Sequence, residues 1–167
     1  MEPWQQLDRA SLPEARRLLT TCCGSSAWVE RMLRRRPFGS EESLTTAARE
    51  AWVDLTHTDW LEAFSHHPKI GDRASLAKRF AATAHLSAQE QSGVDDATAQ
   101  VLDDLAAGNR AYEDRFGYIF IVCASGKSAA EMLGLLHSRL RNTAEAEIRV
   151  AAHEQARITQ LRLQRLG

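Results

Sequence analysis

The sequence predicts an all-α protein, a single-domain bundle of about seven or eight helices that spans residues 1–167. Two patterns lead to this prediction. In most of the chain, apolar residues recur three or four positions apart, which places them on one face of a helix. Helix-starting residues precede many of these stretches, and glycine or proline follows several of them. A chain of 167 residues can bury one sizeable core and is short for two.

Four helices are predicted in the first part of the chain. Ser11 has the character of an N-cap, because Pro13 stands in the first turn and Glu14 is spaced to complete a capping box. Gly24 stops this helix. The predicted helices run from Ser11 to about Cys23, from Ser25 or Ser26 to Pro37, from about Glu41 to Leu55, and from Trp60 to Ser65 after an opening Asp59.

Four further helices are predicted in the second part of the chain. Ser128 and Glu131 have the spacing of a capping box, and the apolar helix that follows them could serve a dimer as readily as a core. The predicted helices cover 74–84, a long stretch that ends near Arg115, the stretch from Ser128 to about Arg141, and the stretch from Thr143 to the C-terminus.

One extended loop segment, residues 116–126, breaks this helical pattern. It is β-branched and aromatic and is bounded by glycines, but the chain has no second strand-like run with which it could form a sheet. We therefore predict extended backbone that passes through a helical core. Its N–H and C=O groups then need other partners, and a bound polar ligand is one candidate.

Composition and charge are those of an ordinary soluble globular protein. Hydrophobic residues make up 44% of the chain and charged residues 26%. The 21 Lys and Arg residues nearly balance the 22 Asp and Glu residues, giving a formal net charge of −1. Nucleic acids and anionic membrane surfaces select for a basic excess, so neither is expected as a partner.

The cysteine pattern indicates a reducing compartment. Cys22, Cys23 and Cys123 are odd in number and include no C-x-x-C spacing, which argues against a disulfide framework. No apolar run approaches the roughly 18 residues of a membrane span, and the N-terminus lacks the core of a signal peptide. We expect the cytoplasm as the location.

The run from His66 to Asp72 is the first candidate site. Pro68 denies His67 the helical region, so a helix that arrives here should stop, and Gly71 permits a backbone turn. A histidine would then be displayed at the end of a helix, which is how a scaffold presents a catalytic group. The alternative is a capped helix end whose histidine only bonds the last carbonyls. Adjacent histidines without an i, i+4 pair do not give the convergent ligands of a metal site, and no metal is expected.

Glu90 is the second candidate, and its spacing allows two interpretations. Ser87 and Glu90 have capping-box spacing, so the glutamate could simply tie down the start of its own helix. A carboxylate near a histidine is also a plausible acid–base pair, because each group tunes the proton affinity of the other. The spacing alone leaves both open.

Several blocks together resemble the OHCU decarboxylase family, where OHCU is 2-oxo-4-hydroxy-4-carboxy-5-ureidoimidazoline, an unstable intermediate of urate breakdown. The resemblance extends from about Trp28 to Leu163, and this chain departs from it at Leu86, where tryptophan is frequent, and at Ile119, where proline is common. The matching blocks are His67–Asp72, Ser87–Gln91, Asn109–Tyr112 leading into Phe116-Gly117, 119–124, Arg139-Leu140-x-Asn142 and Arg157-Ile158-x-x-Leu161-Arg162-Leu163.

The resemblance implies a cofactor-independent decarboxylase that forms (S)-allantoin from a small-molecule substrate, with His67 and Glu90 as catalytic residues. In this hypothesis His67, oriented by Glu90, manages the proton of the substrate hydroxyl, and the pair supplies the stereospecific proton. Arg162 would clamp a substrate oxygen, or else is an exposed helix arginine. The implied substrate-binding residues are Pro68, Ser87, Ala88, Gln89, Gln91, Ile119, Phe120, Ile121, Val122, Cys123 and Arg162.

Two other functions stay open at this point. One is a non-catalytic helical binding domain, in which the histidine segment is only a helix stop. The other is a different lyase or hydrolase that uses the same His and Glu on another ureido compound. A homodimer is the expected assembly.

Overall fold

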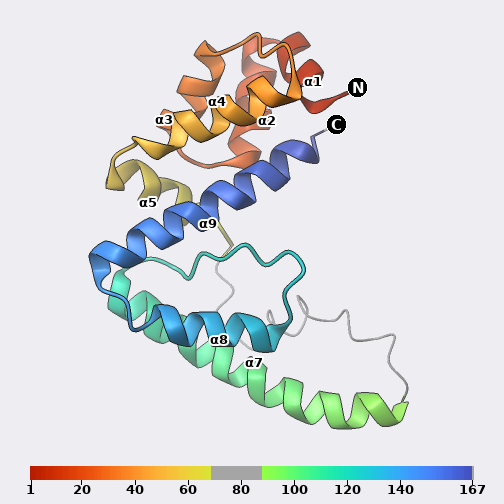
Figure 1. The fold of residues 1–167 in the computed structure, drawn as a ribbon, viewed down its shortest axis with the longest axis vertical. Helices are drawn as coiled ribbons and strands as arrows, with labels where there is room; N and C mark the ends of the chain where they lie inside the picture. Colours follow the sequence, from red (N-terminus) through yellow and green to blue (C-terminus); the bar gives the residue numbers. More distant parts are fainter. Residues whose placement is uncertain (69–87, 167) are drawn as a thin grey trace. The chain divides into compact units, whose positions relative to one another are not determined.

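The computed structural model describes residues 1–68 and 88–166, without the side chains of residues 88–98. These residues form eight helices and no strand, which confirms the all-α prediction (Figure 1). The chain divides into two compact units, Met1–His67 with Ile148–Gly167, and Pro68–Glu147. The single domain expected from the sequence therefore stays a prediction. None of the described helices is both long enough and apolar enough to cross a membrane.

The first unit is a cluster of short helices joined by the long C-terminal helix. Ser11, Ser25 and Ser40 each accept a hydrogen bond from a backbone N–H at the start of a helix, as N-cap residues do. The helices are α1 (Pro3–Arg9), α2 (Leu12–Cys22), α3 (Ser26–Arg34), α4 (Glu41–Val53), α5 (His57–Ser65) and α9 (Ala144–Gln164), of which all but the first turn of α9 belongs to this unit.

Three sequence expectations for this unit need correction. The helix α1 was not predicted, because a single buried apolar residue, Leu7, gives no periodic pattern. The helix α5 begins at His57 and not at Trp60, since Thr56 is the N-cap and Asp59 is the third residue of its capping box. Glu14 does not complete a capping box with Ser11, because its carboxylate pairs with Arg17 at 2.7 Å.

Three indole N–H groups join the helices of the first unit through backbone carbonyls. Trp28 donates to the Ala48 carbonyl at 3.1 Å and Trp52 donates to the Ala152 carbonyl at 2.9 Å. Trp60 donates to the carbonyl of Trp52 itself at 3.1 Å. These bonds connect α3 to α4, α4 to α9 and α5 to α4, so α5 is tied through α4 to the other helices of the unit.

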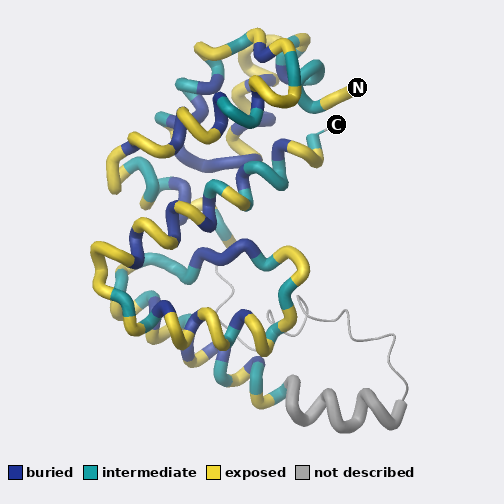
Figure 2. Tube along the Cα trace, viewed as in Figure 1, coloured by how far each residue is buried: buried dark blue, intermediate teal, exposed yellow. Residues whose placement is uncertain are grey.

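The second unit packs two helices and an extended segment around one apolar cluster. The helix α7 (Ala88–Phe116) lies against α8 (Ala129–Arg139), and residues 117–128 run between them without regular structure. Residues 121–123 are buried, as Figure 2 shows along the tube, so the predicted extended passage through a core is confirmed. The buried cluster consists of Leu102, Leu105, Ala106, Tyr112, Val122, Met132 and Leu136. The helix predicted over 74–84 lies outside the described residues.

Candidate functional site

The predicted helix stop is confirmed at His66 and His67. The helix α5 ends at Ser65, and His66 is its C-cap, with its backbone N–H donating to the Ala63 carbonyl at 3.2 Å. The backbone N–H of His67 donates to the Phe64 carbonyl at 3.3 Å. The Phe64 side chain is fully buried, so it anchors the last turn from which the two histidines project. His67 is half-buried, and Pro68 after it is exposed.

The imidazole of His67 is held by a side chain that the sequence did not single out. Its Nε2 is hydrogen-bonded to Oε1 of Gln155, which comes from α9 and is 1% exposed. The amide of Gln155 is fixed in turn, because Nε2 donates to the buried Thr159 hydroxyl at 3.1 Å, one helical turn further along. A histidine that only capped its own helix would bond carbonyls at the end of α5. The ring of His67 is directed instead at a buried amide.

The other histidine, His66, packs over a glycine. A methyl group added to Gly24 would lie 2.3 Å from Cγ and 2.6 Å from Cβ of His66, distances that real side chains do not tolerate. Gly24 follows α2 in the chain, so this close approach fixes the end of α5 against the end of α2. The glycine predicted as a helix stop therefore has a second role, which is to leave room for His66.

We expect Gly24→Ala to destabilise the protein by about 1–3 kcal/mol, because the added methyl group forces His66 and the chain end of α5 to move. Thermal unfolding measures this change. Gly134→Ala is the matched control, since Gly134 is an exposed position within α8 with no atom near an added methyl group. That substitution should stabilise the protein by about 0.5–1 kcal/mol. Equal behaviour of the two variants would contradict the packing role of Gly24.

The predicted residues 87–91 are only partly within the described structure. Ser87 lies outside the described residues, and Ala88, Gln89, Glu90 and Gln91 form the first turn of α7 with undescribed side chains. Their backbone confirms the predicted helix start. Both interpretations of Glu90, as part of a capping box and as an acid–base group, stay predictions.

The extended segment with the predicted residues 119–123 is held by two cationic side chains within the second unit. Nη1 of Arg139 donates to the Ile121 carbonyl at 2.6 Å, and Nζ of Lys127 donates to the Cys123 carbonyl at 2.8 Å. Extended backbone that pairs with no strand must find such partners. The sequence predicted that need and offered a ligand as a candidate, and the protein itself satisfies these two carbonyls. Contact of residues 119–123 with a substrate stays a prediction.

One of these two cationic side chains, Arg139, also belongs to a buried ion pair. Nε of Arg139 lies 2.5 Å from Oε1 of Glu147, and the two side chains are 8% and 0% exposed. Glu147 also accepts from the Tyr112 hydroxyl at 2.9 Å and, through its other oxygen, from Asn142 at 3.1 Å. Burial, together with the neighbouring Glu147, raises the pKa of Tyr112, so its hydroxyl stays a proton donor. The pair therefore has the added hydrogen bonds that a buried ion pair requires.

Two aromatic rings also lie close to the guanidinium of Arg139. Its guanidinium carbon lies 4.5 Å from the centroid of the Phe120 ring and 5.8 Å from that of Tyr112. The Tyr112 and Phe120 rings meet edge to face at 5.3 Å. Arg139 thus fixes both the backbone at Ile121 and the side chain of the preceding residue.

Arg162, predicted to contact substrate, is half-buried on α9, and its Nη1 lies 3.5 Å from the Cys22 carbonyl. All three cysteines are buried free thiols. Burial raises the pKa of Cys22 and of Cys23 to about 11, so both are protonated at neutral pH. In the described part of the chain, no cluster of three or more His, Cys, Asp or Glu side chains has the arrangement of a metal site.

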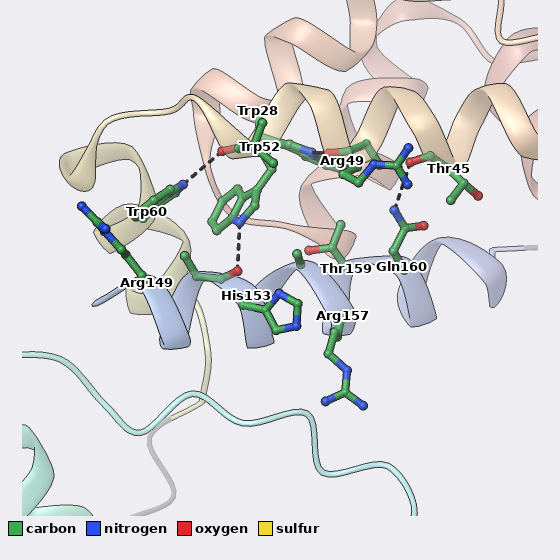
Figure 3. Close-up of a pocket in the computed structure, with 14 residues that line it drawn as sticks. Trp28, Thr45, Arg49, Trp52, Trp60, Arg149, His153, Arg157, Thr159 and Gln160 are labelled. Atoms are coloured by element: carbon green, nitrogen blue, oxygen red, sulfur yellow. Dashed lines mark hydrogen bonds between the residues drawn. The ribbon is translucent and has the colours of Figure 1, made fainter. Parts of the chain in front are cut away.

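A pocket of about 430 Å³ lies in the first unit along α9 (Figure 3). It contains neither His67 nor Gln155, and its charged lining groups are basic. The tryptophans of its wall already use their indole N–H groups in bonds between helices. The lining residues are Trp28, Thr45, Ala48, Arg49, Trp52, Val53, Trp60, Arg149, Ala152, His153, Ala156, Arg157, Thr159 and Gln160.

The comparisons with known proteins agree on one family. The family model for OHCU decarboxylase matches residues 8–164. The chain is 40% identical over 146 residues to the uric acid degradation bifunctional protein TTL of Arabidopsis thaliana, covering 87% of this chain and 45% of that protein. It is 33% identical to the 2-oxo-4-hydroxy-4-carboxy-5-ureidoimidazoline decarboxylase of Amia calva, covering 77% of this chain and 73% of that protein.

A solved structure is also similar to this chain. The crystal structure of an OHCU decarboxylase in the presence of (S)-allantoin matches with a TM-score of 0.68 and 39% identity, over 86% of this chain and 92% of that chain. The present chain spans less than half of the Arabidopsis protein, and 32% of a bifunctional relative from Bacillus sp. (strain TB-90) that is 28% identical.

Proposed function

The chain belongs to the OHCU decarboxylase family, and from this membership we propose that it catalyses the cofactor-independent decarboxylation of OHCU to (S)-allantoin in urate breakdown. The match from residue 8 to residue 164 includes both predicted catalytic residues, His67 and Glu90. The observation that supports the proposal best is the placement of His67. An imidazole at the end of a helix, half-buried and hydrogen-bonded to a buried amide, is suited to proton transfer in a fixed geometry.

The chemistry of the substrate needs no metal or organic cofactor. The carboxylate sits on a ring carbon that also bears a hydroxyl group and is adjacent to a C=N bond. When the bond to the carboxylate breaks, its electron pair forms a C=C bond to the ureido-bearing carbon, and the π pair of the C=N bond moves onto the ring nitrogen as CO2 leaves. One proton from solvent reaches the ring nitrogen, and the hydroxyl proton is then exchanged for a proton on the ureido-bearing carbon. The protein must hold the ring and move these protons on one face.

We assign the proton transfers to His67 and Glu90. His67 accepts the hydroxyl proton as the carbonyl forms, a step suited to an imidazole because the reference pKa of histidine, about 6.5, lies near neutral pH. Glu90 tunes the basicity of the histidine and takes part in supplying the stereospecific proton. Delivery of this proton to one face of the carbon gives the S enantiomer.

Substrate binding is assigned to the remaining predicted residues. Backbone N–H groups of residues 119–123 would bind the ring and urea groups, and the fixed path of this segment supports that role because preorganised donors bind at low entropic cost. Arg162 would clamp a carboxylate or carbonyl oxygen. Pro68, Ser87, Ala88, Gln89 and Gln91 complete the proposed set.

The cytoplasm and a homodimer belong to the same proposal. The three buried free thiols are consistent with a reducing compartment. The helix α8 buries Met132 and Leu136 in its own unit and leaves Leu135 37% exposed, which is the apolar group on α8 that a dimer contact would use.

The decisive experiment generates OHCU in situ from urate and follows the optical activity of allantoin. We expect the wild-type protein to form (S)-allantoin faster than the spontaneous reaction, which is racemic. A signal that never exceeds the spontaneous, racemic background would reject the proposed function. A panel of other ureido compounds, run in parallel, separates this activity from that of a different lyase or hydrolase.

A further inference from the structure

A line of buried polar groups runs from Cys23, the C-cap of α2, to the predicted catalytic histidine within the first unit. It begins at the thiol of Cys23, continues through the Thr159 hydroxyl and the Gln155 amide on α9, and ends at Nε2 of His67. Cys23, Gln155 and Thr159 are 0%, 1% and 4% exposed. Groups this deeply buried must satisfy one another, because water does not reach them.

The direction of these bonds determines which atom of Gln155 faces the histidine. The Thr159 hydroxyl is hydrogen-bonded to the thiol of Cys23. Its oxygen accepts from Nε2 of Gln155 at 3.1 Å, and an amide nitrogen can only donate. The other amide atom, Oε1, faces the ring of His67, and a carbonyl oxygen can only accept. Nε2 of His67 must therefore carry a hydrogen.

We propose that Gln155 is a positioning residue that holds His67 in the Nε2–H tautomer, so that Nδ1 is the ring nitrogen that exchanges a proton with the substrate. The Nε2–H tautomer is inferred from the hydrogen-bond geometry. The role of Nδ1 in proton exchange with the substrate rests on the proposed function. Gln155 touches the imidazole and acts on the reaction only through it.

The placement of Gln155 explains why a neutral amide performs this task. A carboxylate here would be buried beside the ring and would favour the imidazolium form, whereas an amide fixes the tautomer and leaves the ring able to titrate. The charged groups nearby have their own contacts: Glu154 pairs with Arg157 at 3.2 Å, and Arg162 lies at the Cys22 carbonyl. His66 packs over Gly24.

The first test reads the tautomer directly. Protein labelled with 15N in its histidines is examined by long-range 1H–15N NMR without substrate, and His67 is identified by the signals that disappear in His67→Asn. We expect the pattern of the Nε2–H tautomer in the neutral form. The Nδ1–H tautomer, or an even mixture of the two, overturns the proposal.

The second test changes the acceptor. Gln155→Glu places a carboxylate against Nε2–H, which stabilises the imidazolium form and should raise the pKa of His67 by about one pH unit or more. The limb of the pH–rate profile that reports His67 should move to higher pH by the same amount. Gln160→Glu is the matched control, because it adds the same charge to α9 at a residue that bonds the Thr45 carbonyl instead of His67. A shift of equal size in both variants overturns the assignment to Gln155.

The third test removes the support of the amide. Thr159→Val deletes the hydroxyl that receives the Gln155 N–H, so the amide can turn over and the tautomer preference of His67 should weaken. Thr159→Ser keeps the hydroxyl and should restore the wild-type spectrum. An unchanged spectrum in Thr159→Val would contradict the directional line of bonds.

These measurements separate the inference from the proposed function. If the protein fails to decarboxylate OHCU while the NMR results are as expected, the positioning role stands and the substrate assignment falls. The opposite result is that OHCU is decarboxylated, His67 shows the Nδ1–H tautomer and Gln155→Glu leaves the pKa of His67 unchanged. The inference then falls and the function stands.

Discussion

Replacing His67 with asparagine should lower the rate of (S)-allantoin formation by at least about 100-fold, the contribution that a general acid–base group commonly makes. Asparagine keeps a side-chain N–H that can donate to Oε1 of Gln155, so the buried amide retains a partner. It has no group that titrates near neutral pH. The comparison therefore isolates proton transfer from folding.

The rate is measured by optical activity with OHCU generated in situ, and the fold is checked by circular dichroism and thermal unfolding. His137→Asn is the control, because His137 is exposed on α8. It should retain the wild-type rate. Glu90→Gln should also lose activity if Glu90 is the acid–base partner, whereas a glutamate that only caps α7 would give a variant of reduced stability with near wild-type turnover. Wild-type turnover in both His67→Asn and Glu90→Gln would refute the proposed mechanism.

The sequence predicted most of the fold because the helices carry local signals. The N-caps at Ser11 and Ser128 are fixed by residues within one turn, and each lies where its pattern placed it. The pattern left Ser25 and Ser26 open as the start of the next helix, and Ser25 is its N-cap. The capping box of Ser11 with Glu14 was wrong, since a basic residue one turn further on competes for the carboxylate. Spacing cannot show such competition when both partners are polar and exposed.

Residue chemistry alone singled out only reactive side chains, and the other predicted site residues came from the family resemblance. The histidine pair could be singled out because a proline follows it, but His66 and His67 have the same chemistry, and only the family resemblance separated the two. Gln155 was missed because glutamine is usually exposed on a helix. A signal for it did exist, since Gln155 falls on the buried face of α9 with Ala151 and Ala152. Its partner, His67, lies just beyond the end of α5 and 88 residues away, and no local pattern reports that pairing.

Arg139 gives a similar lesson for the second unit. The sequence placed it in a block shared with the family and predicted that the extended segment needs hydrogen-bond partners. It did not connect the two, because the contact between Arg139 and Ile121 depends on how α8 packs beside that segment.

Arg139→Leu is expected to lower the free energy of unfolding of the second unit by about 3–5 kcal/mol, since it leaves the buried carboxylate of Glu147 without its cation. Arg139→Leu combined with Glu147→Gln should recover part of this loss, because the neutral amide no longer requires a counter-charge. Arg16→Leu, which removes one partner of an exposed pair with Glu30, should cost at most about 1 kcal/mol.

Urea unfolding can follow each unit separately, because all four tryptophans, Trp4, Trp28, Trp52 and Trp60, lie in the first unit and both tyrosines, Tyr112 and Tyr118, lie in the second. In the wild type, coincident tryptophan and tyrosine transitions would support the single domain that the sequence predicts. If the units are independent, Arg139→Leu should move only the tyrosine transition to lower urea. A loss below about 1 kcal/mol in that transition would mean that the ion pair does not hold the segment. Because Arg139 also bonds the Ile121 carbonyl, the same variant should lose OHCU turnover at urea concentrations where the first unit is still folded.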